Sequence, residues 1–489
     1  MKKLATYVML IAILAFAITG CGNKKIEETT DKDTKISDTK KIEPEIIRMV
    51  MKDLSPSNEE HVKYIEKVED GLKKQGINVK IELTEMPPGT YAEKLNLMLL
   101  DQDIPDIIYF QGGDQQMVNQ GLLEDLTPYI EKSSIVKNRL EAFNKARMES
   151  YPYLLWIKPV ATKVPVVRQD WFNELDISKE LVENPSIDNY YKLFKEITDK
   201  KSKYGITVAG DISKLDNIFN QAFGLENTWM LENGEYIYSK ITSNEKEKIE
   251  FYAKLYKDGL LDPEYLTKKW DTKEQAFYSG EAGVILGTSG KVVDIYDGNM
   301  KKQNGDDSTI MVLPPAKGKE QGYLPYNITK ESRGIAISTT SKKKDLAWSV
   351  IEFLVSDEGQ YIDRLGIEGV HYNVENEKIT LTDKAQNWFA YFFEVTKWKP
   401  EMEMTTPLLG KSATKSLEMA TQYYSNDNVF VVPEELLTYE DAIKNLYNEW
   451  TAEVITGKKT IDSFDEFKEE WYKLGGNKLT EYANKTLKQ

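Results

Sequence analysis

Carboxylates are the side chains best able to do chemistry in this sequence, because Asp and Glu number 79 of 489 residues. Glycoside hydrolysis needs only two of them at about 5–9 Å separation, so such abundance makes any single pair uninformative. A nucleophile elbow needs glycine on both sides of the serine at fixed spacing, which Thr288-Ser289-Gly290 lacks. We therefore expect no catalytic activity. We interpret residues 287–290 as a strand-end loop whose backbone N–H groups approach a ligand.

Metal chemistry has few ligands available. His61 and His371 are the only histidines, and Cys21 is the only cysteine. Neither a multi-histidine centre nor a thiolate zinc site can form from them. We expect no metal site and no cofactor. The formal net charge of −15 also argues against nucleic acid as a partner, because nucleic-acid binding depends on clustered Lys and Arg.

Cys21 follows a segment that is typical of export. A cationic start precedes an apolar run over residues 8–18, which is a secretory signal and is shorter than the roughly 20 residues that span a bilayer. Residues 18–21, Ile-Thr-Gly-Cys, resemble a lipobox, in which the cysteine sulfur takes a diacylglyceryl group and becomes the mature N-terminus. We predict a signal peptide over residues 1–20 and lipidation of Cys21. An ordinary signal peptide with an incidental cysteine is the alternative.

The segment after the cysteine is polar and charged. Residues 22–43 contain few apolar residues and no aromatic residue. Such a segment cannot bury enough surface to fold. We predict that residues 21–44 form a disordered tether between a lipid anchor and the folded part of the chain.

The folded part begins with alternating strands and helices. Ser57-Asn58-Glu59-Glu60 resembles a capping box and predicts a helix that Gly76 ends. A second helix is predicted over residues 92–100. The predicted strands cover residues 46–51, 78–83 and 105–110. This alternation favours an α/β fold with helices on both faces of a sheet. Because ligands gather outside the carboxyl ends of such strands, the loops at Tyr91 and at residues 112–114 are the first candidates for contact.

Five short motifs lie along the chain in a fixed order. They are EKLN with DIPDII within residues 93–108, GLLEDLTP at residues 121–128, GEAGV at 280–284, SDEG at 356–359 and GIEGVHY at 366–372. Together they resemble the family 1 extracellular solute-binding lipoproteins, which feed ATP-driven carbohydrate importers of Gram-positive bacteria. The resemblance covers essentially all of residues 45–489.

The resemblance implies a periplasmic-binding-protein-like fold, in which hinge strands join two α/β lobes that close on a ligand. We predict a first lobe of residues 45–161 plus 327–372 and a second lobe of residues 162–326 plus 373–489. The chain then crosses between lobes near residues 159–161, Tyr326 and His371. The implied partners are a carbohydrate and the permease subunits of an importer, for a monomer held at the extracellular face of the cell membrane.

One departure from the family concerns calcium. Many relatives carry a calcium loop rich in Asp, Asn and Gly after the first helix of the second lobe. Here residues 199–204 read Asp-Lys-Lys-Ser-Lys-Tyr. Calcium requires several oxygen ligands, and three lysines would repel the ion. We predict that this site is absent.

Sugar recognition needs polar groups for the hydroxyls and aromatic rings for the apolar sugar faces. Trp229 and Trp270 stand in loop-like sequence, whereas Trp388 lies one helical turn before Tyr391 and could instead be core. Trp171, Trp348, Trp450 and Trp471 lie in helix-like patterns and are predicted to pack in the core. The candidate ligand-binding residues are Tyr91, Asp114, Trp229, Trp270, Tyr326, His371, Tyr372 and Trp388.

The ligand itself stays open at this stage. A monosaccharide, a linear oligosaccharide and a branched fragment would all fit. Six of the 64 basic residues are arginine, and a uronate favours a planar guanidinium, so neutral sugars are favoured. Two other functions compete with sugar binding for transport. They are a surface-anchored polysaccharide-degrading enzyme and a non-transport adhesin or scaffold lipoprotein.

Overall fold

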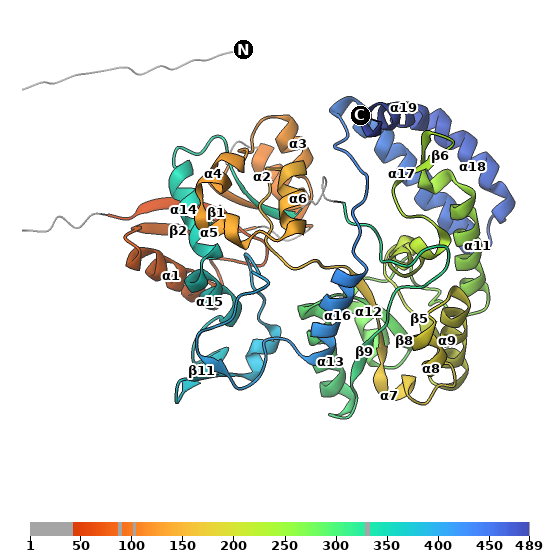
Figure 1. The fold of residues 1–489 in the computed structure, drawn as a ribbon, viewed down its shortest axis with the longest axis horizontal. Coiled ribbons are helices and arrows are strands. Elements are labelled where there is room, and N and C mark those ends of the chain that lie inside the picture. Colours follow the sequence, from red (N-terminus) through yellow and green to blue (C-terminus); the bar gives the residue numbers. More distant parts are fainter. Residues whose placement is uncertain (1–42, 87–89, 101–103, 328–332, 489) are drawn as a thin grey trace, which may run out of the picture. The chain divides into compact units, whose positions relative to one another are not determined.

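The computed structural model describes residues 43–86, 90–100, 104–327 and 333–488 (Figure 1). The predicted signal peptide, Cys21 and all but the last two residues of the predicted tether lie outside the described residues. By its internal contacts the chain divides after Glu43, and residues 44–489 form one unit. Within the described ranges no helix is long and apolar enough to cross a membrane.

The first sheet has four strands in the order β10-β3-β1-β2. The strands are β1 (Glu45–Val50), β2 (Val79–Leu83), β3 (Ile107–Gln111) and β10 (Arg333–Ile337). The first three are parallel to one another, and β10 runs antiparallel to β3. The three predicted strands are therefore confirmed to within two residues at each end.

Both faces of this sheet are buried. Along β1, Ile47 and Met49 pack in one core cluster, while Val50 packs in another on the opposite face. Successive strand residues point to opposite faces, so β3, which is covered on both sides, is apolar over residues 107–110. The edge strand β2 instead alternates buried and exposed residues. Helices supply the covering layers: α1 (Glu59–Lys74), α2 (Tyr91–Leu100), α3 (Asp114–Asn119), α4 (Thr127–Lys132), α5 (Ser134–Arg139), α6 (Ala142–Ser150), α14 (Lys344–Val355) and α15 (Asp357–Leu365).

The start of α1 differs from the prediction by one residue. Asn58 is the N-cap, and its side chain accepts hydrogen bonds from the backbone N–H groups of Glu60 and His61. The predicted cap, Ser57, instead lies with its Oγ 2.6 Å from that of Ser55. The helix ends as predicted before Gly76, whose φ of +83° suits a residue without a side chain.

A small three-stranded sheet follows α15. It consists of β11 (Tyr372–Glu375), β12 (Lys378–Leu381) and β13 (Glu403–Met404). Trp388, Phe393 and Trp398, from the same stretch of chain, pack in the core cluster that contains β1. The lobe boundaries of the sequence analysis stay predictions. This packing favours a third crossing after Trp398 rather than at His371.

The second sheet has the strand order β5-β8-β4-β9. The strands are β4 (Lys163–Arg168), β5 (Tyr204–Ile206), β8 (Ala282–Thr288) and β9 (Ile310–Val312). β4 runs antiparallel to both of its neighbours, while β5 and β8 are parallel. The remaining regular elements are a hairpin of β6 (Trp229–Glu232) and β7 (Glu235–Tyr238) and the helices α7 (Gln169–Phe172), α8 (Ser178–Glu183), α9 (Ile187–Lys200), α10 (Asp216–Phe219), α11 (Ser243–Lys257), α12 (Trp270–Tyr278), α13 (Lys291–Asn304), α16 (Lys411–Gln422), α17 (Glu434–Ile455), α18 (Phe464–Trp471) and α19 (Asn477–Leu487).

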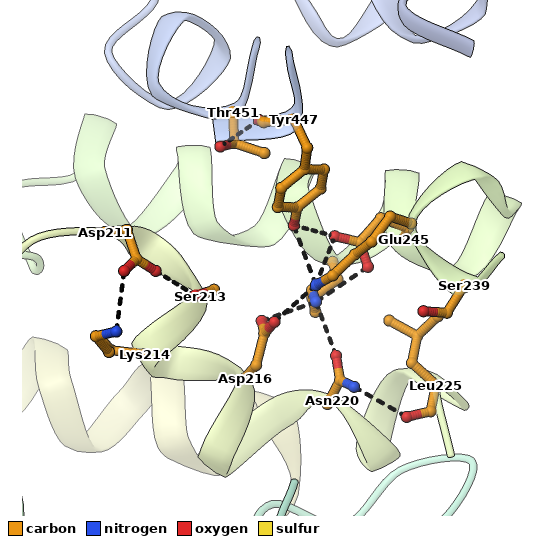
Figure 2. A network of polar contacts seen from close by, with 12 residues as sticks. Asp211, Ser213, Lys214, Asp216, Asn220, Leu225, Ser239, Glu245, Tyr447 and Thr451 are labelled. Carbon is orange, nitrogen blue, oxygen red and sulfur yellow. Dashed lines mark hydrogen bonds and ion pairs between the residues drawn. The ribbon is translucent and has the colours of Figure 1, made fainter. Parts of the chain in front are cut away.

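A buried charge network joins α17, the first of the last three α-helices, to α10 and α11 (Figure 2). Lys248 Nζ lies 2.7 Å from Asp216 Oδ1 and 3.0 Å from Glu245 Oε2. Lys240 Nζ lies 2.8 Å from Asp216 Oδ2, and the Tyr447 hydroxyl donates to Glu245. Each buried charge therefore has an opposite charge beside it, which is what makes burial of ionised groups tolerable.

Candidate functional site

The carboxyl edge of the second sheet gathers cationic and aromatic side chains. β8 ends at Thr288, directly opposite Lys163, the first residue of β4. Lys163 Nζ donates to Thr288 Oγ1 at 3.3 Å. In the loop after β8, the backbone N–H of Ser289 donates to Thr162 O and that of Gly290 to Ser416 Oγ, both at 2.8 Å. These two N–H groups are used within the protein, contrary to the sequence-based interpretation that they approach a ligand.

Trp270 is the predicted site residue that stands most clearly at this edge. It begins α12 rather than lying in a loop, and 45% of its surface is exposed. Two ammonium groups lie near the ring centre, Lys273 Nζ at 3.6 Å and Lys163 Nζ at 4.6 Å. Cations are attracted to the face of an indole ring, so the two lysines hold this exposed ring in place.

The two lysines have unusual proton affinities. Burial, and then the positive charge of Lys163, lower the pKa of Lys273 to about 7. Burial, and then the charges of Arg333 and Lys214, lower the pKa of Lys163 to about 8. Low dielectric and like charges both disfavour an ammonium ion. Such shifts are typical of functional sites, and these two place a change of charge close to neutral pH.

The carboxyl edge of the first sheet also places a basic residue opposite the end of a strand. β3 ends at Gln111, directly opposite Arg333, the first residue of β10. Gln111 Oε1 and Gln115 Nε2 are buried atoms without a hydrogen-bond partner in the part of the chain that the structure describes. A buried polar atom left unpaired costs about 1–3 kcal/mol. The acceptor and the donor are therefore suited to an outside hydroxyl group.

Gln111 and Gln115 flank the 112–114 loop that the sequence analysis singled out, but they were not predicted. Asp114, which was predicted, begins α3 and is buried, where it accepts a hydrogen bond of 2.7 Å from the Tyr151 hydroxyl. The Tyr91 hydroxyl donates to Tyr109 O at 2.6 Å. Their polar groups hold the strand-end loops together at this edge.

Trp229 lies in a different environment from the one expected. It begins β6 rather than lying in a loop, and only 5% of its surface is exposed. Its ring stacks on Phe430 with centres 5.8 Å apart, and Asn428 bonds both its N–H and its carbonyl. Trp229 belongs to the core cluster of the second sheet.

The structure brings His371, Tyr372 and Trp388 together in the core of the first sheet, where all three are buried. The His371 and Trp388 rings lie 4.3 Å apart, and His371 Nε2 lies 3.2 Å from Glu60 Oε1. Burial lowers the pKa of His371 although Glu60 opposes the shift. The helical spacing inferred for Trp388 and Tyr391 is wrong, because Trp388 follows a 3₁₀ turn and no helix covers the pair. All three side chains are in packing positions.

Tyr326 takes part in an aromatic group. Its ring lies 4.7 Å from Phe143 of α6 and 6.3 Å from Tyr424. Its backbone pairs with the segment at Asn426 in a parallel bridge. Tyr326 thus stands where segments far apart in the sequence meet.

Comparison with known proteins identifies the family. The description "Bacterial extracellular solute-binding protein" matches residues 56–361, which is more than half of the chain. The chain belongs to this family. The resemblance drawn from the five motifs is thereby confirmed, and the chain is a binding protein rather than an enzyme.

Relatives of known structure share the fold. The alginate-binding protein AlgQ2, solved without calcium ion, superimposes with a TM-score of 0.67 at 16% identity, over 92% of this chain and 99% of that protein. NgtS, an N-glycan transport solute-binding protein from Streptococcus pneumoniae, superimposes with a TM-score of 0.66 at 13% identity, over 91% of this chain and 99% of that protein. The S. pneumoniae ABC-transporter substrate-binding protein FusA in complex with kestose superimposes with a TM-score of 0.63 at 17% identity, over 91% of this chain and 99% of that protein. The predicted two-lobe α/β fold class is confirmed.

A relative from Bacillus subtilis (strain 168) matches along nearly the whole length of both chains. Lipoprotein LipO is 22% identical over 98% of this chain and 97% of its own length. The match includes the N-terminal region that lies outside the described residues.

Proposed function

We propose that the protein is the lipid-anchored, extracellular substrate-binding component of an ABC importer and that it binds a sugar or oligosaccharide. The observation that carries this proposal is the half-exposed Trp270 ring at the carboxyl edge of the second sheet. An exposed tryptophan offers a large rigid face for the apolar side of a sugar ring. The sheet edge is where ligands of open α/β folds bind.

Polar groups suited to sugar hydroxyls accompany the ring. The unpaired Gln111 Oε1 and Gln115 Nε2 supply an acceptor and a donor at the edge of the first sheet. Lys163 supplies a donor beside Trp270. Of the residues predicted from sequence we retain Trp270 as a direct contact. We assign Trp229, His371, Tyr372 and Trp388 to the cores that support the two sheet edges.

The relatives support the same function. AlgQ2 is named for alginate, NgtS for N-glycan and FusA for a complex with kestose, and all three have this fold. FusA is named as an ABC-transporter protein, which supports the importer as partner. LipO is named as a lipoprotein, which supports attachment of a lipid at Cys21.

Residues 22–489, heated with a panel of neutral and acidic glycans, test the proposal. We expect one class to raise the melting temperature, since a ligand at a hundred times its dissociation constant stabilises the folded state by about 2.7 kcal/mol. Trp270→Ala should abolish the shift, while Trp171→Ala, a matched half-buried tryptophan, should keep it. Absence of a shift with every glycan of the panel would refute sugar binding. Release of cleaved sugar with turnover would favour the degrading enzyme.

A further inference from the structure

Three lysines are buried in the part of the chain that the structure describes: Lys248, Lys268 and Lys273. Lys248 and Lys268 each have an ammonium 2.6–2.7 Å from a buried carboxylate. Lys273 is 3% exposed and has no carboxylate within 4.0 Å among the described residues. Its Nζ donates to Leu286 O at 3.0 Å instead. A buried ammonium without a counter-ion is costly, which is why burial lowers the pKa of Lys273 to about 7. A ligand anion would supply the missing counter-ion at the edge of the second sheet.

A second cation lies close to Lys273. Lys163 is half-buried, and it too has no carboxylate of the described residues within 4.0 Å. Both ammonium groups lie within 5 Å of the centre of the Trp270 ring. The other charged and titratable groups facing the pair are Lys214, Arg333, Glu274 and Tyr296, with Asp271 beside Glu274 and Asp211 paired to Lys214. Four cationic groups therefore lie among three carboxylates, of which Asp211 is already paired with Lys214.

We propose that Lys163 and Lys273 bind an anionic group of the ligand, a carboxylate or a sulfate carried by an acidic sugar, beside the exposed ring of Trp270. This inference rests on the proposed function, namely that a sugar binds at this edge. An acidic sugar ring combines an apolar face with a fixed negative charge, and the site combines an exposed indole with two cations. A neutral sugar would leave both ammonium groups without a counter-ion.

The shortage of arginine does not oppose this ligand class. Arginine is preferred where a carboxylate is gripped by two parallel hydrogen bonds, whereas lysine acts as a point charge. Two lysines approaching from β4 and α12 supply comparable charge without that geometry. The net charge of −15 acts from a distance and is screened beyond about 10 Å at 0.1 M salt. Local charge therefore decides recognition.

Proton uptake should accompany binding. In the free protein the pKa of Lys273 is about 7 and that of Lys163 about 8. A bound anion favours the charged form of each lysine and raises both pKa values. Near pH 8 the ligand should therefore bind with net uptake of protons. Affinity for an anion should fall as pH rises through about 7 to 9, while affinity for a neutral sugar should change little.

Calorimetric titration of the mature chain tests this inference. The probes are a panel of oligouronides, their carboxyl-reduced neutral counterparts and sulfated disaccharides, each titrated at pH 6.5 and 8.5. We expect the acidic probe to bind about tenfold to a hundredfold tighter than its neutral counterpart at pH 6.5, the size of one charge-assisted hydrogen bond. In Lys163→Gln the affinities for the acidic probe and its neutral counterpart should differ by no more than about threefold. Lys273 would account for the difference that remains.

Lys195→Gln is the matched control, because Lys195 is exposed on α9 and pairs with Asp199. It should leave the acidic-to-neutral ratio unchanged. Uronide binding without sulfate binding identifies a carboxylate, and the reverse identifies a sulfate. If a neutral glycan binds at least as tightly as every acidic probe at both pH values, the inference is wrong and the proposed function stands. If no glycan binds at all, the proposed function itself is wrong.

Discussion

Replacing Trp229 by alanine separates a packing role from a binding role. Sequence context suggests a cleft residue, whose loss would weaken binding and spare stability. The structure leaves only 5% of the residue exposed and packs its ring against Phe430 and Tyr238. Truncating a buried tryptophan costs about 3–5 kcal/mol, because the lost contacts leave a cavity. We therefore expect Trp229→Ala to lower the free energy of unfolding by that amount and to keep its ligand affinity where it remains folded.

Trp270→Ala is the matched comparison. Its ring is half exposed, two lysines lie near its centre, and its indole N–H bonds Glu274. Its loss should therefore cost less than about 2 kcal/mol of stability, the scale of exposed cation–π contacts and one hydrogen bond. Urea unfolding followed by circular dichroism gives the stability of both variants, and calorimetric titration gives their affinities. The reasoning is refuted if Trp229→Ala unfolds like the wild type but loses the ligand, or if Trp270→Ala is the less stable of the two.

Four further outcomes are expected. Lys248→Met, which leaves the buried Asp216 and Glu245 facing Lys240 alone, should cost about 3–5 kcal/mol in urea unfolding. Burial raises the pKa of Asp216, but Lys240 and Lys248 outweigh it and lower the pKa to about 2. The ionised group therefore stabilises the folded state above about pH 4, and this stabilisation should be lost as the pH falls through 2. Asp216→Asn should remove this part of the pH dependence from the free energy of unfolding measured in acid. Cys21→Ala should accumulate as precursor or appear in the medium, as immunoblots of cell fractions would reveal; mature protein in the membrane fraction would contradict lipidation. Neither calcium nor a chelator should shift the melting temperature, because Lys200, Lys201 and Lys203 hold carboxylates in ion pairs at the family's calcium loop.

The strands of the first sheet could be predicted because each one is a short apolar or alternating run. β3 is buried on both faces, whereas the edge strand β2 alternates buried and exposed residues. The residues of the site could not be predicted in the same way. Trp229 and Trp270 stand in similar polar sequence, yet Trp229 is covered by Phe430, about two hundred positions along the chain. Burial of a single ring is decided by such distant partners, and local sequence does not contain them.

Lys163 and Lys273 gave no sequence signal for a related reason. They are 110 positions apart, and they meet because β4 pairs with β8 while α12 directly precedes β8. Their importance lies in their surroundings, since no carboxylate of the described residues lies within 4.0 Å of either ammonium group. Gln111 and Gln115 were not predicted as site residues for the same reason. A side-chain amide atom without a partner can be recognised only when the positions of its neighbours are known.

The charge network around Lys248 has a consequence for the order in which the chain is completed. Glu245 and Tyr447, which bond in the finished protein, are separated by 202 positions. At a synthesis rate of about 5–20 residues per second, Tyr447 is made roughly 10–40 seconds after Glu245. During that time the core around α10 and α11 lacks its C-terminal helices and exposes apolar surface. We expect this half of the molecule to stay open until the last sixty residues arrive, and to be the half that a chaperone must hold.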